Sequence, residues 1–544
     1  MTLPALFLAA GNPLRLYLER VFMKDPFQGV YQLNSFDLLL LIPYFTLLSI
    51  LAFYGLHRYF LVYTYWRYRQ NRPVPPAGEW AARPRVTVQL PLYNERYVAE
   101  RLIDEVCRLD YPRELLEIQV LDDSTDETVA VARHAVERQA ALGYSIAYYH
   151  RDNREGYKAG ALAEGLRQAT GEFIAIFDAD FLPPPDFLQK TLPYFLDPNV
   201  GMAQTRWNFI NRNYSILTRV QSILLDGHFI LESGARSRSG CFFNFNGTAG
   251  IWRRKAIENS GGWQHDTLTE DTDLSYRAQL QGWKFVYLQD VECMSELPVE
   301  MNAFRSQQAR WAKGLIQTGR KLLPTLWRAR LPWKIKMEAF FHLTANISYP
   351  LMSLMAALLL PGMIVRFYQG WFQMLYIDLP LLLASTASIS TFYLAAQREM
   401  FPKDWKKSIK YLPFLMASGI GLTLTNSRAV LEALLGVRSE FVRTAKYRIE
   451  SGSDRIAAKN YRHRTARLIS VVELLAGCYF AYATYYAAKN EYYLTVPFLC
   501  LFVMGYLGMG LYSLFQGEMG KAAERLASWL TPAVPPIAKD LQKS

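Results

Sequence analysis

Six long runs with no charged residue, or with only one, constrain the fold of this 544-residue chain more than any other feature. A helix that crosses a bilayer needs about 20 mostly apolar residues. Five of the runs meet this requirement and predict membrane-spanning helices on both sides of a polar stretch from about Arg83 to Lys336. The six runs are Leu38–Leu56, Leu343–Val365, Leu379–Ala396, Tyr411–Ser427, Leu468–Ala488 (with Glu473) and Tyr492–Gln516.

The fourth run, Tyr411–Ser427, is short, and the charge around it predicts a different role. Segments rich in Lys and Arg are expected on the cytoplasmic side of a membrane. Both flanks of Tyr411–Ser427 are of this kind, which predicts an interfacial or re-entrant helix continuing into Ala429–Leu435. The count is then five spans, and a sixth is the alternative because the length also suits a crossing. The basic segments are Arg58–Arg85, Arg320–Lys336, Arg398–Lys410 and Arg428–Arg467, and the nearly uncharged joints are Phe367–Gln373 and Lys489–Glu491.

These patterns divide the chain into seven parts. In the first 24 residues no basic segment precedes an apolar core, so no cleaved secretory signal is expected. The predicted parts are an extracytoplasmic segment (1–35), a first span (36–60), a cytosolic domain (83–336), two spans (342–396), an interfacial helix with a following loop (408–466), two more spans (467–516) and a short cytosolic tail (517–544).

Charge and cysteine usage exclude other classes. The chain has a net charge of +12, and its Lys and Arg residues are concentrated beside the apolar runs, as expected of cytoplasmic loops near anionic lipid. The sequence has no compact basic motif with interleaved aromatic residues, so nucleic acid is not an expected partner. The five cysteines have neither zinc-type nor disulfide-framework spacing. Cys107, Cys241 and Cys293 lie in the polar stretch and are expected to be buried thiols in a reducing cytosol.

The polar stretch alternates strand-like and helix-like segments, which predicts a parallel α/β sheet. The predicted strands are Val86–Leu90, Ile118–Leu121, Ser145–Tyr149 and Phe173–Phe177, and the predicted helices are Tyr97–Leu109, Asp126–Leu142 and Lys158–Ala169. Ligands of open α/β sheets bind at the carboxyl ends of the strands. Acidic residues that directly follow a strand are therefore the first candidates for a site.

Asp178 and Asp180 follow the apolar strand Phe173–Phe177. Two carboxylates two positions apart can converge on one hard cation, and Mg²⁺ commonly joins one or two carboxylates to substrate phosphates. A solvated turn is the plainer explanation of a single Asp-x-Asp. Asp122 and Asp123 end the strand Ile118–Leu121. A helix cap formed by Ser124 or Thr125 would explain this segment, a role of Asp123 near a nucleotide or its metal is the functional interpretation, and both can hold at once. Asn94 and Glu95 end the first strand and are placed to wrap a base and ribose.

Thr269–Asp273 contains three acids at the start of the helix-like segment Leu274–Gln281. Acids at a helix start complement the helix dipole. In a sugar transfer with inversion, however, one carboxylate must take the proton of the acceptor hydroxyl. Asp271 is the predicted base, and the sequence does not rank it above Glu270 or Asp273.

Gln307, Arg310 and Trp311 share one helical face, because they are three and four residues apart. Arg310 can grip a diphosphate with two hydrogen bonds, and Trp311 can stack on a sugar. A membrane-surface helix with a snorkelling Arg is the alternative. Lys158 begins a helix after a glycine turn, a good position for a phosphate contact or simply an exposed Lys.

The segment Phe242–Thr248 mixes aromatic rings with amides and a hydroxyl, as carbohydrate-binding surfaces do. Its candidate residues are Phe245, Asn246 and Thr248. A core strand followed by a turn is an equal alternative. Placed beside apolar spans, this charged pocket indicates an enzyme that builds a sugar polymer on one side of a membrane.

Together these motifs make the region Arg85–Gly314 and its flanking spans resemble the membrane-embedded family 2 glycosyltransferases. These are the cellulose, hyaluronan and mannan synthases, and the likeness is to the cellulose-synthase-like mannan and glucan-backbone enzymes in particular. The strings that carry the resemblance are Val120–Asp126, Arg151–Ala161, Phe177–Phe181, Phe245–Gly250, Thr269–Asp271 and Gln307–Trp311.

The resemblance implies an α/β GT-A fold, a Rossmann-like nucleotide-sugar-binding domain inserted in an α-helical transmembrane region. It implies an inverting transfer that depends on Mg²⁺ or Mn²⁺, held with the donor by Asp178 and Asp180. Asp271 would be the base and Trp311 would lie under the acceptor. The implied donor site comprises Asn94, Glu95, Asp122, Asp123, Lys158, Asp178, Gln307 and Arg310. A gating loop of the cellulose synthases is similar to Phe441–Lys446, including Phe441, Thr444 and Lys446, but Arg443 stands where that loop has Val.

The sequence thus predicts a processive β-glycan synthase of the inner (plasma) membrane with a cytoplasmic catalytic domain. UDP-glucose, giving a β-glucan, is favoured narrowly over GDP-mannose, giving a mannan or glucomannan. The expected partners are this donor, the growing glycan and membrane lipid. The alternative is a non-processive transferase with a lipid acceptor, against which five spans and a gating-like loop argue. The intact acidic clusters argue against a catalytically silent scaffold or transporter.

Overall fold

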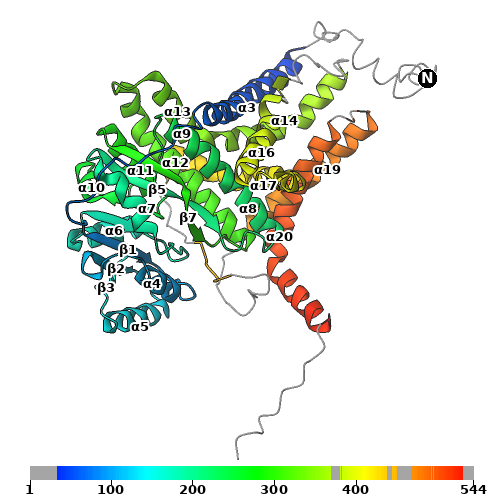
Figure 1. The fold of residues 1–544 in the computed structure, drawn as a ribbon. Helices are drawn as coiled ribbons and strands as arrows, with labels where there is room; N and C mark the ends of the chain where they lie inside the picture. The colour runs from blue at the N-terminus through cyan, green and yellow to red at the C-terminus, as the bar shows by residue number, and fades with distance from the viewer. Residues whose placement is uncertain are drawn as a thin grey trace, which may run out of the picture.

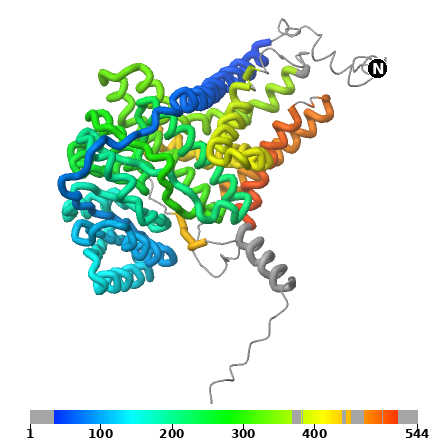
Figure 2. The backbone as a smooth tube through the Cα atoms, in the orientation of Figure 1, coloured from blue at the N-terminus to red at the C-terminus, as the bar shows by residue number. Residues whose placement is uncertain are grey.

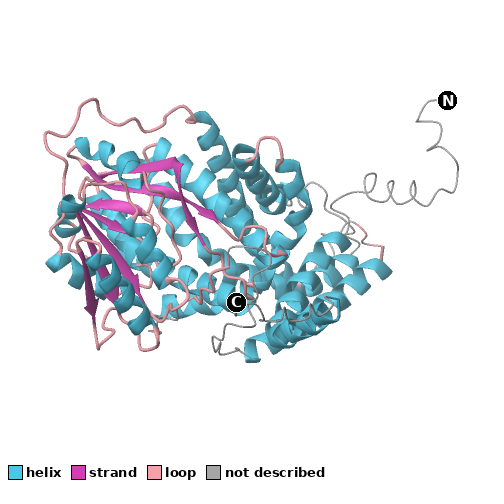
Figure 3. Cartoon of the chain, turned by 60° about the horizontal axis from the view of Figure 1, so that its bottom comes forward, coloured by secondary structure: helices cyan, strands magenta, loops and turns pink. Residues whose placement is uncertain are grey.

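The structure is a computed structural model and describes residues 34–368, 380–381, 383–437, 444–449, 467–491, 493 and 495–530. A domain built around a β-sheet occupies one side of the molecule, and long helices extend from the other (Figures 1 and 2). With strands and helices coloured separately, Figure 3 shows the strands fanning out on the left and a cluster of helices on the right.

A mixed sheet of seven strands, in the order β3-β2-β1-β4-β6-β5-β7, forms the centre of the domain. β3, β2, β1 and β4 are parallel, as predicted. The sequence predicted no strand at β6, which is antiparallel to β4 and β5. The chain reaches β6 at the edge where β4 ends, because Gly250 pairs with Ile176, and it must therefore run back. The strands are β1 (Val86–Leu92), β2 (Leu116–Asp122), β3 (Ile146–His150), β4 (Phe173–Ile176), β5 (Val200–Phe209), β6 (Gly250–Arg253) and β7 (Lys284–Ser295).

Helices cover both faces of this sheet. Along β4, Phe173 and Ala175 belong to one buried cluster and Ile174 and Ile176 to the other, because successive side chains of a strand point to opposite faces. The first cluster includes α4 (Ala99–Cys107), α5 (Thr128–Ala141) and α7 (Phe187–Thr191). The second includes α6 (Tyr157–Gln168), α10 (Arg254–Asn259) and α11 (Glu270–Leu280). Because helices pack on both faces, the sheet is held in place, and with it the strand ends at which the candidate site lies.

Within the described ranges, four helical segments are long and apolar enough to cross a membrane. They are Ser35–Arg67, Trp333–Arg366, Leu468–Lys489 and Val496–Phe515. The elements concerned are α3 (Ser35–Arg67), α13 (Trp333–Thr344), α14 (Ser348–Tyr368), α19 (Arg467–Lys489) and α20 (Val496–Leu530). Leu379–Ala396 is described only in part, as the π-helical η6 (Leu383–Ala387) and the start of α16 (Ser388–Met400). The count of five spans stays a prediction.

The predicted interfacial segment forms two helices, α17 (Leu412–Gly421) and α18 (Thr423–Leu435), preceded by η7 (Trp405–Tyr411). The helical structure does continue to Leu435, as the sequence indicated. Gly421 lets α17 approach α20 closely, because a side-chain carbon there would lie 2.7 Å from the carbonyl oxygen of Gly505. α18 packs on α12 (Met301–Arg328), the helix of the Gln307–Trp311 motif. Whether the segment lies at the interface stays a prediction.

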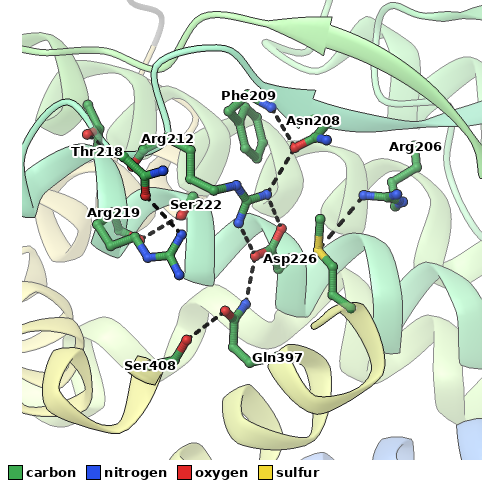
Figure 4. A network of polar contacts seen from close by, with 12 residues as sticks. Arg206, Asn208, Phe209, Arg212, Thr218, Arg219, Ser222, Asp226, Gln397 and Ser408 are labelled. Atoms are coloured by element: carbon green, nitrogen blue, oxygen red, sulfur yellow. Dashed lines mark hydrogen bonds and ion pairs between the residues drawn. The ribbon is translucent and has the colours of Figure 1, made fainter. Parts of the chain in front are cut away.

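A buried ion pair joins the sheet domain to α16 (Figure 4). Arg212 donates to both carboxylate oxygens of Asp226, over 2.6 and 2.9 Å. Asp226 ends α8 (Ile216–Asp226), and Gln397 of α16 donates to it over 2.7 Å. Ser408 then donates to Gln397 over 2.9 Å. These contacts fix α16 and η7 relative to α8 of the sheet domain.

Candidate active site

One pocket lies at the sheet edge where the parallel strands end. Its walls come from strand ends, the start of α11, one face of α12 and the segment Thr444–Lys446. Most of the residues predicted to bind or react therefore meet in one place. From the predicted set the pocket is lined by Glu95, Asp123, Lys158, Asp178, Asp180, Asn246, Glu270, Asp271, Gln307, Arg310, Trp311, Thr444 and Lys446.

Asp178 and Asp180 face this pocket just beyond β4. Lys158 Nζ lies 2.5 Å from Asp178 Oδ1, and Lys446 Nζ lies 2.7 Å from Asp180 Oδ2. The other oxygen of each carboxylate accepts no hydrogen bond from any residue that the structure describes. These described residues hold no group of three or more His, Cys, Asp or Glu able to bind a metal. Two carboxylates with one free oxygen each still fit a divalent ion whose remaining ligands come from a diphosphate and water.

The charge balance of the pocket supports the same fit. Seven acidic side chains line it against four basic ones, an excess of three carboxylates. Those acids that are ionised would repel a diphosphate, and a bound divalent cation would offset that repulsion. The acids are Glu95, Asp123, Asp178, Asp180, Glu270, Asp271 and Glu296, and the bases are Arg154, Lys158, Arg310 and Lys446.

Glu270 and Asp271 occupy the first turn of α11, at the pocket wall. Burial raises the pKa of Asp271 to about 7, and the neighbouring carboxylate of Glu270 adds to the rise. A carboxyl group with a pKa near the working pH is well suited to accept a proton. Asp273, which the sequence left as an alternative, faces away from the pocket and pairs with Arg277 and Lys321 over 2.7 and 2.9 Å.

Two buried cations face these acids. Burial lowers the pKa of Arg310, while Glu270 and Asp178 oppose that change. For Lys158, burial alone would lower the pKa, but Asp178 and Glu270 outweigh it, so the pKa of Lys158 is raised. Both groups place positive charge at the wall of the pocket, beside the acids. Gln307 and Trp311 line the pocket from the same face of α12 as Arg310.

The two carboxylates at the end of β2 point in different directions. Asp123 lines the pocket and accepts two hydrogen bonds from Arg151, over 2.7 and 2.5 Å. Asp122 is fully buried and does not line the pocket. Its oxygens accept from the hydroxyl of Tyr148 (2.6 Å) and the N–H of Ser124 (2.9 Å). The prediction that Asp122 contacts the nucleotide is therefore corrected: adjacent strand residues face opposite ways, so only Asp123 reaches the site.

Asn94 is also displaced from the pocket, while its neighbour Glu95 lines it. Asn94 has a left-handed backbone with φ of +55°, which Asn tolerates better than most residues. Its Oδ1 accepts the N–H of Thr125 over 2.8 Å. Asn94 thus joins the loops that follow β1 and β2 and leaves Glu95 as the residue facing the site.

Of the three candidates in the segment Phe242–Thr248, only Asn246 lines the pocket. Phe245 is fully buried and packs edge-on against Trp252, with ring centroids 5.7 Å apart. Thr248 is buried and its hydroxyl accepts the N–H of Asp178 over 2.8 Å. The predicted acceptor contacts of Phe245 and Thr248 are corrected: one belongs to the core, and the other positions the loop that carries Asp178.

In the gating-like loop, Phe441 and Arg443 lie outside the described residues, and Thr444 and Lys446 line the pocket. Glu296, which follows β7, holds the segment that includes them. Its two carboxylate oxygens accept the N–H groups of Tyr447 and Arg448, each over 2.9 Å. No sequence pattern pointed to Glu296, because its partners are about 150 positions away.

Tyr93 and Arg154 are two further lining residues that the sequence did not single out. The guanidinium of Arg154 lies 3.4 Å from the centroid of the Tyr93 ring. Arg154 belongs to the string Arg151–Ala161, and Tyr93 directly precedes the candidates Asn94 and Glu95, so proximity to those residues was the available signal.

Comparison with known proteins decides the family. The model of "Glycosyltransferase like family 2" matches residues 84–314. Glucomannan 4-beta-mannosyltransferase 7 of Arabidopsis thaliana is 35% identical over 460 residues, which cover 79% of this chain and 78% of that protein. This chain belongs to the family 2 glycosyltransferases. The resemblance to the cellulose-synthase-like enzymes and the GT-A fold of the sheet domain are thereby confirmed.

Two other relatives match over a shorter region. Glucomannan 4-beta-mannosyltransferase 1 of Oryza sativa subsp. japonica is 44% identical over 288 residues, 52% of this chain and 54% of that protein. Glucomannan 4-beta-mannosyltransferase 2 of Arabidopsis thaliana is 48% identical over 250 residues, 45% of this chain and 47% of that protein. The match thus spans about half of each of these two glycosyltransferases.

Among solved structures, the mannosyltransferase PcManGT of Pyrobaculum calidifontis, in complex with GDP-Man and Mn²⁺, gives a TM-score of 0.47 at 25% identity. That match covers 66% of this glycosyltransferase and 99% of the solved chain. The S. aureus TarS structure gives a TM-score of 0.32 at 15% identity, over 65% of this chain and 55% of that one.

Proposed function

We propose that this glycosyltransferase is a processive, inverting β-mannosyltransferase that uses GDP-mannose to extend a mannan or glucomannan. The observation that carries the proposal is the single pocket that unites paired carboxylates, buried cations and a near-neutral acid, in a chain whose relatives are glucomannan 4-beta-mannosyltransferases. These relatives favour GDP-mannose, so the narrow preference for UDP-glucose drawn from the sequence is withdrawn.

The donor is held by its diphosphate. Asp178 and Asp180 are the residues that would hold Mg²⁺ or Mn²⁺, which neutralises diphosphate charge when bound. Lys158 and Arg310 supply positive charge to the same group, and Gln307 on the same face as Arg310 supplies hydrogen bonds. Asp123 and Glu95, at the ends of β2 and β1, face the nucleoside.

The reaction needs one proton acceptor. Asp271 takes the proton of the acceptor hydroxyl while that oxygen attacks the anomeric carbon from the side opposite the diphosphate. The new glycosidic bond forms as the bond to the diphosphate oxygen breaks. The nucleoside diphosphate leaves with the electron pair, and the configuration at the carbon inverts. Trp311 stacks under the acceptor sugar and holds it in line.

The proposal extends to the membrane. Trp311 lies on α12, and Phe304 of the same helix packs with Leu422 and with Met509 of α20. An acceptor on Trp311 would thus sit close to helices apolar enough to span a bilayer. We place the catalytic domain in the cytoplasm beneath the plasma (inner) membrane and propose that the product crosses between these helices.

The test is activity of the purified full chain in nanodiscs with labelled GDP-mannose, GDP-glucose, UDP-glucose and UDP-GlcNAc, each with Mg²⁺ or Mn²⁺. The expected result is a polymer of β-linked mannose from GDP-mannose that EDTA abolishes and D271N lacks. Polymer from UDP-glucose alone would overturn the donor assignment. A product with one sugar on lipid would instead establish the non-processive alternative.

A further inference from the structure

Asn246, the pocket residue beside the predicted base, is held by a side chain outside the predicted site. His228 lies on the π-helical turn η4 (Gly227–Ser233). Its Nε2 is 2.9 Å from Asn246 Oδ1, and its Nδ1 is 2.9 Å from Glu232 Oε2. Both ring nitrogens thus face oxygen atoms, and a ring that carries its N–H at Nε2 donates to the amide oxygen of Asn246.

The hydrogen bonds around Asn246 fix the orientation of its amide. Asn244 Nδ2 donates to the carbonyl of Phe245 (2.9 Å) and to Asn246 Oδ1 (3.2 Å). Asn246 Oδ1 therefore receives two donors, one from Asn244 and one from His228. The Nδ2 of Asn246 is buried and has no hydrogen-bond partner among the described residues. A buried amide donor left without a partner is costly unless a ligand accepts from it.

The main chain around Asn246 is fixed next to Asp271. The N–H of Asn246 donates to Gln204 Oε1 over 2.9 Å, and Lys158 donates to the carbonyl of Gly247 over 2.9 Å. A side-chain carbon at Gly247 would lie 3.1 Å from Asp271 Oδ2. An acceptor hydroxyl that gives its proton to Asp271 must therefore come close to Asn246.

A chain of hydrogen bonds and ion pairs, half-buried at Glu232 and buried at Arg236, holds His228 in place. Glu232 lies 3.5 Å from Arg236, and Arg236 lies 2.9 Å from Glu338 of α13. Glu338 in turn lies 2.8 Å from His57 of α3. Burial would raise the pKa of Glu232, but His228 and Arg236 hold it well below its usual range, so a carboxylate anion faces His228 Nδ1.

We propose that His228 is a positioning residue for the sugar acceptor. Its Nε2–H fixes the amide of Asn246 so that Nδ2 donates to an oxygen of the terminal hexose, next to Asp271. This inference rests on the proposed function for the existence of a sugar acceptor, but it does not depend on which donor sugar is used. Its consequence is that loss of the Nε2–H raises the KM for the acceptor and leaves the KM for the donor unchanged.

Two substitutions distinguish the contributions of the two ring nitrogens of His228. The amide nitrogen of Gln in H228Q falls near the position of Nε2, and that of Asn in H228N near Nδ1. The full chain in nanodiscs is given short β-oligosaccharide acceptors and whichever donor it uses, and KM is measured for each substrate. N246A serves as the variant that removes the positioned amide itself, and GDP binding and thermal unfolding are measured for every variant.

H228N and N246A should each raise the acceptor KM about five- to twentyfold, the value of one or two hydrogen bonds, with donor KM and GDP affinity within twofold. H228Q should restore the acceptor KM to within about threefold of wild type. The double variant H228N/N246A should be no worse than N246A alone, since both act through one amide. Equal impairment in H228Q and H228N, or a raised donor KM in either, would overturn the role of His228. Failure to use a hexose acceptor at all would instead count against the proposed function.

Discussion

The ion pair between Arg212 and Asp226 gives a prediction whose size can be worked from the structure. The side chains are 9% and 2% exposed, so both charges lie out of water. Removing one partner of a buried pair leaves an uncompensated charge and costs about 3–5 kcal/mol. Loss of the hydrogen bond from Gln397 (2.7 Å) adds about 1 kcal/mol. D226A should therefore destabilise the chain by about 4–6 kcal/mol.

Thermal unfolding in nanodiscs, followed by tryptophan fluorescence, is the assay, and D226A should lower the midpoint by about 3–5 °C, because the unfolding entropy grows with the 544-residue length of the chain. The matched control is D404A, whose exposed pair with Lys407 (2.7 Å) should contribute less than about 1 kcal/mol. The double variant R212M/D226L removes both charges and should recover most of the loss. The reasoning is refuted if D226A and D404A have the same unfolding midpoint, or if the double variant is as unstable as D226A.

Four further predictions concern the pocket and the ion pair between Arg305 and Glu473. Because the pKa of Asp271 is raised to about 7, kcat/KM should fall about tenfold per pH unit below 7, and D271N should lower kcat about 10²–10⁴-fold and remove that pH dependence. Ionisation of this buried acid opposes folding, so wild type should lose stability from about pH 4 to 7 and D271N should not. E473A leaves the buried guanidinium of Arg305, 2.9 Å from Glu473, without this carboxylate. It should lower the free energy of unfolding by about 3–5 kcal/mol in the same assay, and E473Q should lower it less. W311A should raise the acceptor KM about tenfold in initial-rate measurements while W311F keeps most of the stacking.

The sequence anticipated the parts of the site that follow from strand direction. Parallel strands end at one edge, so carboxylates after successive strands meet there, as Asp123 and Asp178 do. The same rule could not choose between Asp122 and Asp123, because a shift of one residue turns a strand side chain to the other face. The helical spacing of Gln307, Arg310 and Trp311 was enough to place all three on the pocket wall.

What the sequence did not predict depends on long-range pairing. The antiparallel β6 follows from its pairing with both β4 and β5, which no local pattern encodes. The hydroxyl of Thr248 accepts the N–H of Asp178, although the two residues are 70 positions apart in the sequence. Glu296 and His228 likewise acquire their roles from partners on other elements. Hydrophobic periodicity identifies elements, whereas the neighbours of a buried polar group are set only when those elements pack.

The central claim is that Asp178 and Asp180 hold a divalent ion together with a nucleoside diphosphate. Electron paramagnetic resonance of Mn²⁺ titrated into the full chain in nanodiscs, with and without GDP, tests it most directly. The account predicts one bound Mn²⁺ per chain whose affinity rises with GDP, and loss of this ion in D178N/D180N but not in D404A. Unchanged Mn²⁺ binding in D178N/D180N, or no effect of GDP, would contradict it.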